Sequence, residues 1–574
     1  MILAAGHLQR PDYFVLIGYF ALMLGIGLYF FRRMQGMKDY FSGGNQIPWW
    51  LSGVSFYMSS FSVATFVQYS ALAYLYGQVA VTLYWVTVPA TLVSVMFFSR
   101  RWRRARIDSP VEYLETRYSG TVRQLFAWQG IVVRLIDSAL KLVAIGIFVH
   151  KTVGIDMKPS MLGAGLIMLA YTFLGGLWAV TVTDFIQFIV LAAGVLILLP
   201  LSLREVGGFE GLLHSLPDSY LQLTHTEYNW FYIASNILLF SLAFSSVQWS
   251  LIQRYYCVPT ERDAYKVGGL VVVLNIVTPP LMFLPAIAAS RFLPGLDDAG
   301  HVYPLLCAHL LPAGMFGLVI AAMFSATMSM LSSDYNVCAS VLTNDVYKRL
   351  IRPDAPQREL VWVGRLMTLA VGLVALALAW SMSDFGGEDL FRNMITLFSI
   401  ATAPMAIPMI AGLLSSRVTH RAALAGFLAG VAAGLVVLLV CPDLLEYNDL
   451  AIKKANVIFF GASITTLVVM LLTAMLDRAT SEETRRAETF IRRLDVPIGE
   501  MDQDRVTRTT ATSPFTIVGI SIALIGGMML GVLPTVEDNL AFMMDLAIGL
   551  ALAILGAAMV VGNRLSKRKQ ERTL

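Results

Sequence analysis

Hydroxyl side chains gather in two stretches of the chain that are otherwise apolar. The first stretch, SFYMSSFSVATF at residues 55–66, contains Ser55, Ser59, Ser60, Ser62 and Thr65. The second stretch, SLAFSSVQWS at residues 241–250, contains Ser245, Ser246 and Gln248. Ser and Thr in an apolar helix often bond back to their own backbone or join neighbouring helices. Their occurrence in two distant segments favours a second interpretation, in which interrupted helices present oxygen atoms to a small ligand.

Oxygen ligands for a hard cation also occur in two further apolar segments. TVTDFIQF contains Asp184, which has no lysine or arginine near it in the sequence, and SATMSMLSSDYN contains Ser329, Ser332 and Ser333. These three serines are three and four residues apart, so a helix places them on one face. Sodium, like other hard cations, prefers oxygen ligands. Asp184 is therefore a candidate sodium ligand, and an interfacial helix cap is an equally good interpretation of its position.

A third pattern of charges lies in VVRLIDSALKL, where Arg134, Asp137 and Lys141 recur at helical spacing. Ionisable residues within an apolar segment are costly and tend to pair with one another. Internal pairing is the favoured interpretation here. The alternative is that Arg134 binds a substrate carboxylate with two parallel hydrogen bonds.

The composition indicates that long apolar helices position these residues. The 574 residues are 57% hydrophobic and 14% charged, whereas soluble domains are about 45–50% apolar and about 25% charged. Apolar runs such as YFVLIGYFALMLGIGLYFF approach the roughly 20 residues needed to cross a bilayer. The net charge of +4 comes from basic residues in short loops beside these runs, which favours membrane topology over nucleic-acid binding. We therefore expect a polytopic protein in a lipid bilayer.

Hydropathy predicts fifteen spans, centred near residues 21, 62, 88, 136, 170, 194, 242, 279, 328, 371, 403, 431, 464, 524 and 551. Basic residues follow alternate spans, as in Arg32, Arg33 and Lys38, Arg100–Arg106, Arg254, Arg262 and Lys266, and Lys348, Arg349 and Arg352. Cytoplasmic loops are enriched in Lys and Arg. We therefore expect a multi-pass protein of the cell membrane (an inner or plasma membrane), with its N-terminus outside and its C-terminus in the cytoplasm.

This organisation divides the chain into seven predicted segments. They are an N-terminal span with its cytoplasmic loop (1–46), a five-span block (47–203), an extracellular loop (204–229), a second five-span block (230–416), two further spans (417–476), a charged cytoplasmic linker (477–513), and two last spans with a basic tail (514–574).

Catalytic motifs are absent from the sequence. The seven histidines are scattered, the four cysteines form no CxxC pair, and no HExxH motif or Gly-rich phosphate loop occurs. We therefore expect no enzyme activity and no cofactor apart from a coupling ion.

Several longer motifs resemble one known family. LTNDVYKRLI followed by RELVWVGRLM, GGLWAVTVTDFIQ, QWSLIQRYY and PMAIPMIAGLLSSRVTHRAALAGFLAG are similar to the sodium/solute symporters, which include bacterial proline, sialic acid and galactose symporters. The resemblance covers residues from about 12 to 476. It implies an all-α, LeuT-type fold with five-plus-five inverted repeats, one preceding helix, extra C-terminal helices and an alternating-access mechanism.

The resemblance also implies two sodium sites. The main site matches the carbonyls of Met58, Phe61 and Ala326 and the hydroxyl of Ser329. Met330 departs from the family pattern, because a thioether replaces the usual second hydroxyl and is a poor ligand for a hard cation. The second site matches Asp184, Ser332 and Ser333 and is complete. We therefore expect the aspartate site to carry more of the sodium coupling than is usual.

The resemblance says less about which residues bind the solute than about which bind sodium. Ser60, Thr65, Tyr84 and Asn275 align with galactose-binding positions whose residue types they do not preserve, and Phe244 aligns with an inner aromatic gate. The full candidate set for the solute is Ser59, Ser60, Ser62, Thr65, Tyr84, Arg134, Phe244, Ser245, Gln248 and Asn275. The expected function is sodium-coupled import of a small polar solute: a sugar, amino acid, sialic acid or other organic acid. Proton-coupled or uncoupled transport, or a transporter-like sensor, are the alternatives.

Overall fold

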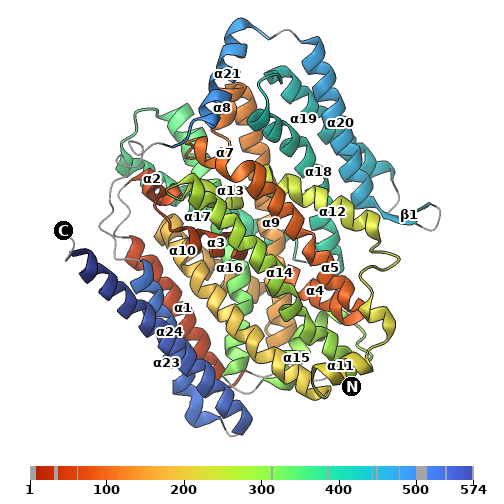
Figure 1. Ribbon diagram of the computed structural model, residues 1–574, viewed down its shortest axis with the longest axis vertical. Helices are drawn as coiled ribbons and strands as arrows, with labels where there is room; N and C mark the ends of the chain where they lie inside the picture. Colours follow the sequence, from red (N-terminus) through yellow and green to blue (C-terminus); the bar gives the residue numbers. More distant parts are fainter. Residues whose placement is uncertain are drawn as a thin grey trace.

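The computed structural model describes residues 8–31, 36–60, 62–311, 314–383, 387–441, 444–447, 450–477, 479–498, 514–536 and 539–571. Helices dominate this part of the chain (Figure 1), and a single short hairpin pairs β1 (Leu444–Tyr447) with β2 (Leu450–Lys453). The all-helical prediction is therefore confirmed.

The helices of the first half are α1 (Arg10–Phe31), α2 (Met37–Ser42), α3 (Trp49–Met58), α4 (Val63–Tyr76), α5 (Gln78–Trp85), α6 (Thr87–Val93), α7 (Ser99–Arg104), α8 (Tyr113–Arg117), α9 (Gly120–Val153), α10 (Met157–Glu205), α11 (Gly208–Ser215), α12 (Trp230–Leu242), α13 (Trp249–Tyr256) and α14 (Glu261–Phe292). Those of the second half are α15 (Val302–Leu310), α16 (Met315–Val341), α17 (Gln357–Ser381), α18 (Gly387–Leu414), α19 (His420–Val440), α20 (Lys454–Leu476), α21 (Ser481–Asp495), α23 (Pro514–Val532) and α24 (Asn539–Glu571).

Within the described residues, 12 helices are long and apolar enough to cross a membrane. The predicted count of about fifteen spans thus stays a prediction. The two counts differ at helices that are interrupted, charged or unusually long. The span centred near residue 62 is the pair α3 and α4, the span near 136 is the charged helix α9, and those near 170 and 194 both fall in α10.

Helix α10 is too long for one crossing of a bilayer. Its 49 residues would make a straight helix about 74 Å long, against a hydrocarbon core about 30 Å thick. Gly176 divides the helix, because its backbone (φ 58°, ψ −164°) departs from helical geometry. A side chain is excluded there, since an added Cβ would lie 2.8 Å from the Tyr40 carbonyl oxygen.

The two hydroxyl-rich stretches are both interrupted helices. Helix α3 ends at Met58 and α4 begins at Val63, with Ser62 in an extended conformation. Helix α12 passes into a π-helical turn, η4 (Ala243–Val247), and Gln248 then separates this turn from α13. Each break leaves backbone carbonyls without a helical partner, so the expectation of two interrupted helices is confirmed.

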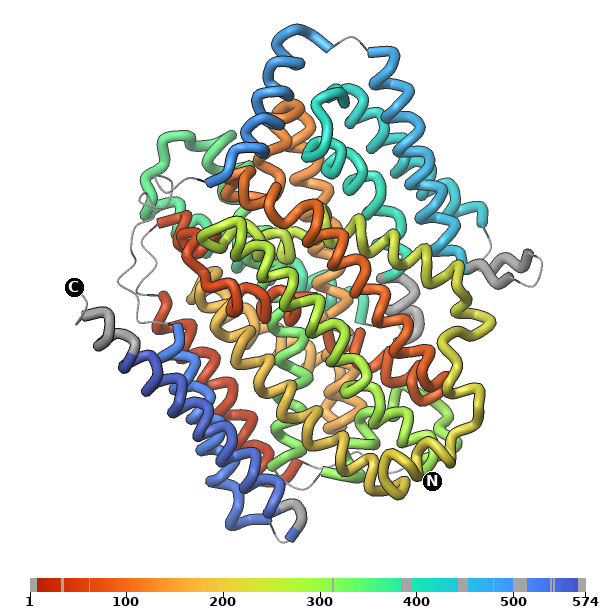
Figure 2. Tube along the Cα trace, viewed as in Figure 1, coloured from red at the N-terminus to blue at the C-terminus, as the bar shows by residue number. Residues whose placement is uncertain are grey.

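Helix α16 forms the centre of the molecule, and the C-terminal pair lies at its edge. In the apolar stretch of α16, 94% of the residues are buried, whereas in the apolar stretch of α24 the share is 22%. Helix α16 packs against α1, α9, α10 and α17. Figure 2 shows α23 and α24, in blue, beside the red α1. Among these 12 apolar helices of the described chain, α16 is therefore the most enclosed.

The predicted cytoplasmic linker contains a docked helix. Helix α21 begins with a capping box made by Thr480 and Glu483, and it packs against α7 and α8. Arg104 donates a 3.0 Å hydrogen bond to the Leu494 carbonyl, and Phe490 stacks on Tyr113 with ring centroids 5.7 Å apart. The described part of this linker is thus held against α7 and α8. Helix α11 occupies part of the loop predicted at residues 204–229.

Candidate functional site

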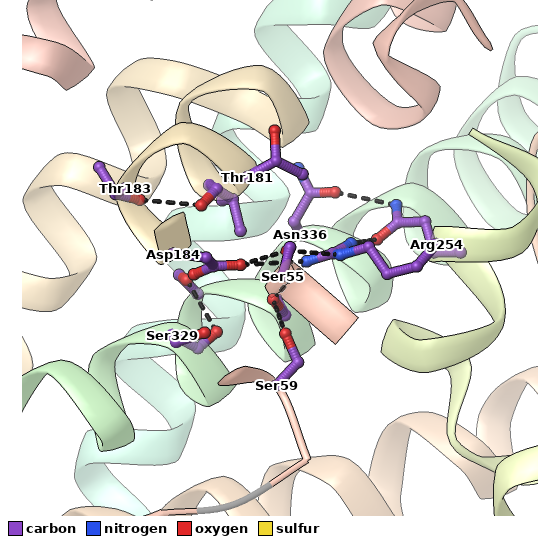
Figure 3. A network of polar contacts seen from close by, with 12 residues as sticks. Ser55, Ser59, Thr181, Thr183, Asp184, Arg254, Ser329 and Asn336 are labelled. Atoms are coloured by element: carbon purple, nitrogen blue, oxygen red, sulfur yellow. Dashed lines mark hydrogen bonds and ion pairs between the residues drawn. The ribbon is translucent and has the colours of Figure 1, made fainter. Parts of the chain in front are cut away.

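Asp184 lies at the centre of a buried polar cluster (Figure 3). Asp184 lies in the middle of α10, and its side chain is fully buried in the protein. These two facts rule out the alternative of an interfacial helix cap. Ser55, from the last turns of α3, donates a hydrogen bond to Asp184 Oδ2. The other carboxylate oxygen, Oδ1, has no hydrogen-bond partner among the described residues. Asp184 therefore keeps one oxygen available for a further ligand.

Arg254 joins this cluster, although the sequence placed it in a cytoplasmic loop. That placement is wrong, because Arg254 lies in α13 and is fully buried. Its Nη2 atom lies 3.6 Å from Asp184 Oδ2 and donates a 2.7 Å hydrogen bond to the Ser333 hydroxyl, while Nε donates a 2.7 Å bond to Ser55. A buried carboxylate needs a compensating charge, and Arg254 supplies that charge for Asp184. The two residues are too far apart in the sequence for a local pattern to indicate the pair.

The serines of α16 meet both Asp184 and the first helix break. Ser333 Oγ lies 2.8 Å from Ser59 Oγ at the end of α3. Ser332 donates a 3.0 Å hydrogen bond to the Ser329 carbonyl, and the Ser329 hydroxyl, which lies beside Asp184, makes no hydrogen bond within the described chain. Asp184 and Ser333 are thus brought together through Arg254 and Ser55, as part of one cluster.

The predicted main sodium site falls at the same junction. The Val63 amide, at the start of α4, donates a 3.1 Å hydrogen bond to Thr327 of α16, so the α3–α4 break is tied to α16 next to Ala326. Met58, Ala326 and Ser329 are all buried there. Phe61 lies outside the described residues. Met330 lines the neighbouring cavity.

A cavity of about 640 Å³ opens beside this junction. Its volume is in the usual range for small-molecule sites, about 300–1,000 Å³. Seven of the predicted solute residues line it: Ser59, Ser60, Ser62, Thr65, Tyr84, Phe244 and Gln248. Aromatic rings of Tyr69, Phe240 and Phe398 and the hydroxyls of Thr87 and Thr402 add to the lining. The cavity is therefore mainly apolar, with a small number of polar groups.

The other three predicted solute residues lie outside this lining. Arg134 donates a hydrogen bond to the Val247 carbonyl and lies over Trp249, 4.6 Å from the ring centroid. It thereby satisfies a carbonyl left open by the η4 break. Asn275 donates a 3.2 Å bond to Thr91, and Ser245 is buried. Their roles in solute binding remain predictions.

Two charged residues of α9 line the cavity and were not among the predicted solute ligands. Lys141 Nζ lies 2.6 Å from Asp137 Oδ2 and 3.0 Å from Asp334 Oδ2 of α16. The internal pairing of Asp137 with Lys141 is thus confirmed, and Asp334 is an additional partner. The helical spacing of Asp137 and Lys141 was the available signal for the pair, whereas nothing local in the sequence points from either of them to Asp334.

Lys453, the residue just before α20, also lines the cavity. Its Nζ lies 3.9 Å from the Tyr228 ring centroid and 3.4 Å from Glu227 Oε2. Burial lowers the pKa of Lys453, and the neighbouring Glu227 opposes this shift. Lys453 is therefore held by the loop that precedes α12.

Comparison with known proteins agrees with this architecture. Residues 40–430 match the model of the sodium:solute symporter family. The chain is 26% identical over 435 residues to a sodium/sialic acid symporter of Proteus mirabilis, covering 72% of this chain and 87% of that protein. It is 25% identical over 451 residues to a sodium/glucose cotransporter of Vibrio parahaemolyticus, covering 72% and 82%.

A solved structure shares the fold. The substrate-bound, outward-open structure of a Na⁺-coupled sialic acid symporter superimposes with a TM-score of 0.72 at 23% identity, covering 82% of this chain and 98% of that one. The matched family consists of transporters, and the matched residues run from the end of α2 into α19, including both helix breaks, Asp184 and the serines of α16. The chain therefore belongs to the sodium:solute symporter family and is a multi-pass membrane protein that couples solute transport to sodium.

Proposed function

We propose that this chain imports a small polar organic solute with sodium by alternating access, and that the cavity beside the α3–α4 break binds the solute. The observation that carries the proposal is the meeting of this break with α16. Ser59 lines the cavity and also contacts Ser333, so the solute space and the Asp184 cluster share a wall. A common wall is the contact through which one ligand can change the affinity for another.

We assign sodium to two neighbouring positions on α16. The main site consists of the carbonyls of Met58, Phe61 and Ala326 with the Ser329 hydroxyl, and the second of Asp184, Ser332 and Ser333. Support comes from the two oxygens that have no hydrogen-bond partner in the described chain, Asp184 Oδ1 and Ser329 Oγ. Buried polar atoms normally find a partner, so such a pair is consistent with an ion-binding position.

Uptake into proteoliposomes tests the proposal. Uptake of radiolabelled sugars, amino acids and sialic acids should rise severalfold when a sodium gradient replaces a choline gradient. Ser329→Ala should reduce this stimulation. Thr183→Val is the matched control, because the Thr183 hydroxyl bonds only to carbonyls of its own helix. Equal uptake in sodium and choline would refute sodium coupling.

Proton-coupled or uncoupled transport is the second candidate. It is favoured by Met330, which removes a hydroxyl from the main site, and by Arg254, whose guanidinium already lies next to Asp184. The same proteoliposomes distinguish the two: a proton gradient without sodium should drive uptake only if protons are the coupling ion.

We further propose fifteen spans with an outer N-terminus and a cytoplasmic C-terminus in the cell membrane. The division of α10 at Gly176, the α3–α4 pair and α9 supply the three spans beyond the 12 helices identified by length and hydropathy. The two five-span blocks, 47–203 and 230–416, would then form the inverted repeats, with segments 1–46, 204–229, 417–476, 477–513 and 514–574 around them. Labelling of single cysteines introduced at Asp218 and at Glu482 with an impermeant reagent tests this topology, since only the first should react in intact cells.

A further inference from the structure

Helix α1 is bonded to the start of α16 through one carboxylate. Asp12, in the first turn of α1, is buried, and its Oδ1 atom accepts hydrogen bonds of 2.7 Å from the backbone amides of Gly314 and Gly317. The first amides of a helix have no partner within that helix, and the helix dipole favours a negative charge beside them. Asp12 therefore caps α16 from a different helix.

The backbones of the two helices are also in close contact at this point. A Cβ atom added to Gly317 would lie 2.7 Å from both the Cα atom and the carbonyl oxygen of Asp12. Neither of these atoms can move aside as the end of a flexible side chain could. A larger residue at position 317 would therefore push the start of α16 away from α1.

A second polar contact joins the same helices seven residues further along α1. Tyr19 is buried, and its hydroxyl oxygen lies 2.7 Å from Ser325 Oγ of α16. The Ser325 hydroxyl donates its own hydrogen to the Ala321 carbonyl at 2.7 Å, so Tyr19 is the donor in the bond between them. Residues seven apart lie on one face of a helix. One face of α1 therefore holds α16 at two points along its length.

Tyr19 lies close to the predicted sodium ligands. Ser325 precedes Ser329 by one helical turn on α16, so the two share a face. Gln187, which follows Asp184 by about one turn on α10, lies beside Tyr19. The Tyr19 hydroxyl is therefore placed where α1, α10 and α16 pack together, one turn from each of the two ligands.

We propose that α1 fixes the position and rotation of α16 for sodium binding, with Asp12 and Tyr19 as the positioning residues. Ser329 is then held beside Asp184 before the ion arrives, and an arrangement that is already in place lowers the cost of binding. This inference deepens the proposed sodium coupling and rests on it. It assigns a role to a helix that lies outside the residues matched by the family model, 40–430.

Sodium titration of the full-length protein in lipid nanodiscs tests this role without a solute. A ligand that binds the folded state raises the unfolding temperature, which is measured against sodium concentration with choline chloride keeping the ionic strength constant. Tyr19→Phe removes only the hydroxyl. We expect the sodium concentration that gives half of the temperature shift to rise about 3- to 10-fold.

Tyr118→Phe is the matched control. Tyr118 is also buried, and its hydroxyl donates a single 2.8 Å hydrogen bond to the Pro408 carbonyl, away from α1 and α16. This variant should lower the unfolding temperature and leave the half-saturating sodium concentration unchanged. An unchanged sodium requirement in Tyr19→Phe, or an equal rise in Tyr118→Phe, overturns the proposal.

The contact at the start of α16 gives two further variants. Asp12→Asn retains an acceptor but loses the charge, and should raise the sodium requirement about 2- to 5-fold. Gly317→Ala should raise it severalfold by separating the helices. Gly25→Ala, on α1, is the control, because an added Cβ there meets no atom within 4 Å. If Tyr19→Phe or Gly317→Ala does not fold, an unchanged sodium requirement in Asp12→Asn overturns the proposal.

The wild-type protein separates this inference from the function on which it rests. If sodium does not stabilise the wild type at any concentration, sodium coupling fails and the role of α1 fails with it. If sodium stabilises the wild type and the substituted proteins need the same concentration, sodium coupling stands and only the role of α1 is overturned.

Discussion

Two buried charge clusters attach to consecutive residues of α16, Ser333 and Asp334, and they differ in what they face. The pair of Asp184 and Arg254 is fully buried and does not line the cavity of about 640 Å³, whereas Asp137 and Lys141 do line it. Both clusters also contain an oxygen without a hydrogen-bond partner in the described chain, Asp184 Oδ1 and Asp137 Oδ1. The Asp184 carboxylate is therefore closed off from the cavity, whereas Asp137 borders it.

The surroundings explain this difference. The neighbours of Asp184 are the Ser55 hydroxyl and the Arg254 guanidinium, and the hydroxyls of Ser59 and Ser333 meet in the same cluster. Hydroxyl and carboxylate oxygens of this kind suit a small hard cation. Asp137 instead borders a cavity of about 640 Å³ whose lining includes aromatic residues. The packing around each carboxylate therefore decides how much water and how large a group can reach it.

Asp184→Asn should have the largest effect. The substitution removes the charge that a sodium ion would meet and leaves Arg254 buried without its partner. We expect loss of sodium-stimulated uptake in proteoliposomes, with Thr183→Val as the control that retains it. An unchanged dependence on sodium would remove Asp184 from the ion site and would leave the cluster as a structural pair.

The enclosed pair should show strong thermodynamic coupling. Asp184→Asn and Arg254→Met should each cost about 3–5 kcal/mol of stability, because each leaves one buried charge uncompensated. The double substitution removes both charges and should cost clearly less than the sum of the two. Unfolding in mixed micelles measures this cycle, and simple additivity would contradict the pairing seen here.

Lys141→Met sharpens the comparison between the clusters. It leaves Asp137 and Asp334 without their shared cation, but water in the cavity can solvate Asp137. We therefore expect a smaller loss of stability than for Arg254→Met, about 1–3 kcal/mol. The same unfolding assay compares the two variants. An equal or greater loss for Lys141→Met would show that the cavity wall is as dry as the interior.

Met330→Ser tests where the two regions meet. Because Met330 lines the cavity next to the main site, restoring a hydroxyl should strengthen sodium binding severalfold, measured as the sodium concentration that half-saturates uptake. Weaker sodium binding would contradict the assignment of the main site. An altered solute preference with unchanged sodium dependence would assign Met330 to the cavity alone.

Ser329→Ala should have the smallest effect on stability. Its hydroxyl makes no hydrogen bond within the described chain, so its removal should change the free energy of unfolding by less than about 0.5 kcal/mol. Sodium affinity should nevertheless fall. Ser325→Ala is the comparison, because Ser325 bonds to Tyr19 and to the Ala321 carbonyl and should lose more stability.

Local patterns predicted the helices and much of the site. Serine clusters in apolar runs located both helix breaks, since polar residues at such positions need a protein or water environment. The same reasoning selected Asp184 and Ser333, which the structure places in one cluster. Long-range partners were not predictable in this way. Arg254 follows an apolar run and resembled a loop residue, and the contact between Lys141 and Asp334 joins helices about 190 residues apart.

The break at Gln248 also limited the prediction for Arg134. Its spacing on α9 gave two interpretations, pairing within the helix or binding a substrate carboxylate. The structure shows a third arrangement, in which Arg134 satisfies the open Val247 carbonyl. Periodicity describes one helix at a time, so it does not indicate that a neighbouring helix has an unsatisfied acceptor.

Consecutive residues of α16 connect the two clusters, since Ser333 bonds to Arg254 and Asp334 pairs with Lys141. Neighbouring side chains on a helix point about 100° apart, and they turn together when the helix turns. A rotation of α16 that loosens one contact must therefore displace the other. If α16 turns as a rigid body, a ligand that binds at the Arg254 contact changes the Lys141 contact as well, and the reverse also holds. No flexible segment is needed between the two clusters.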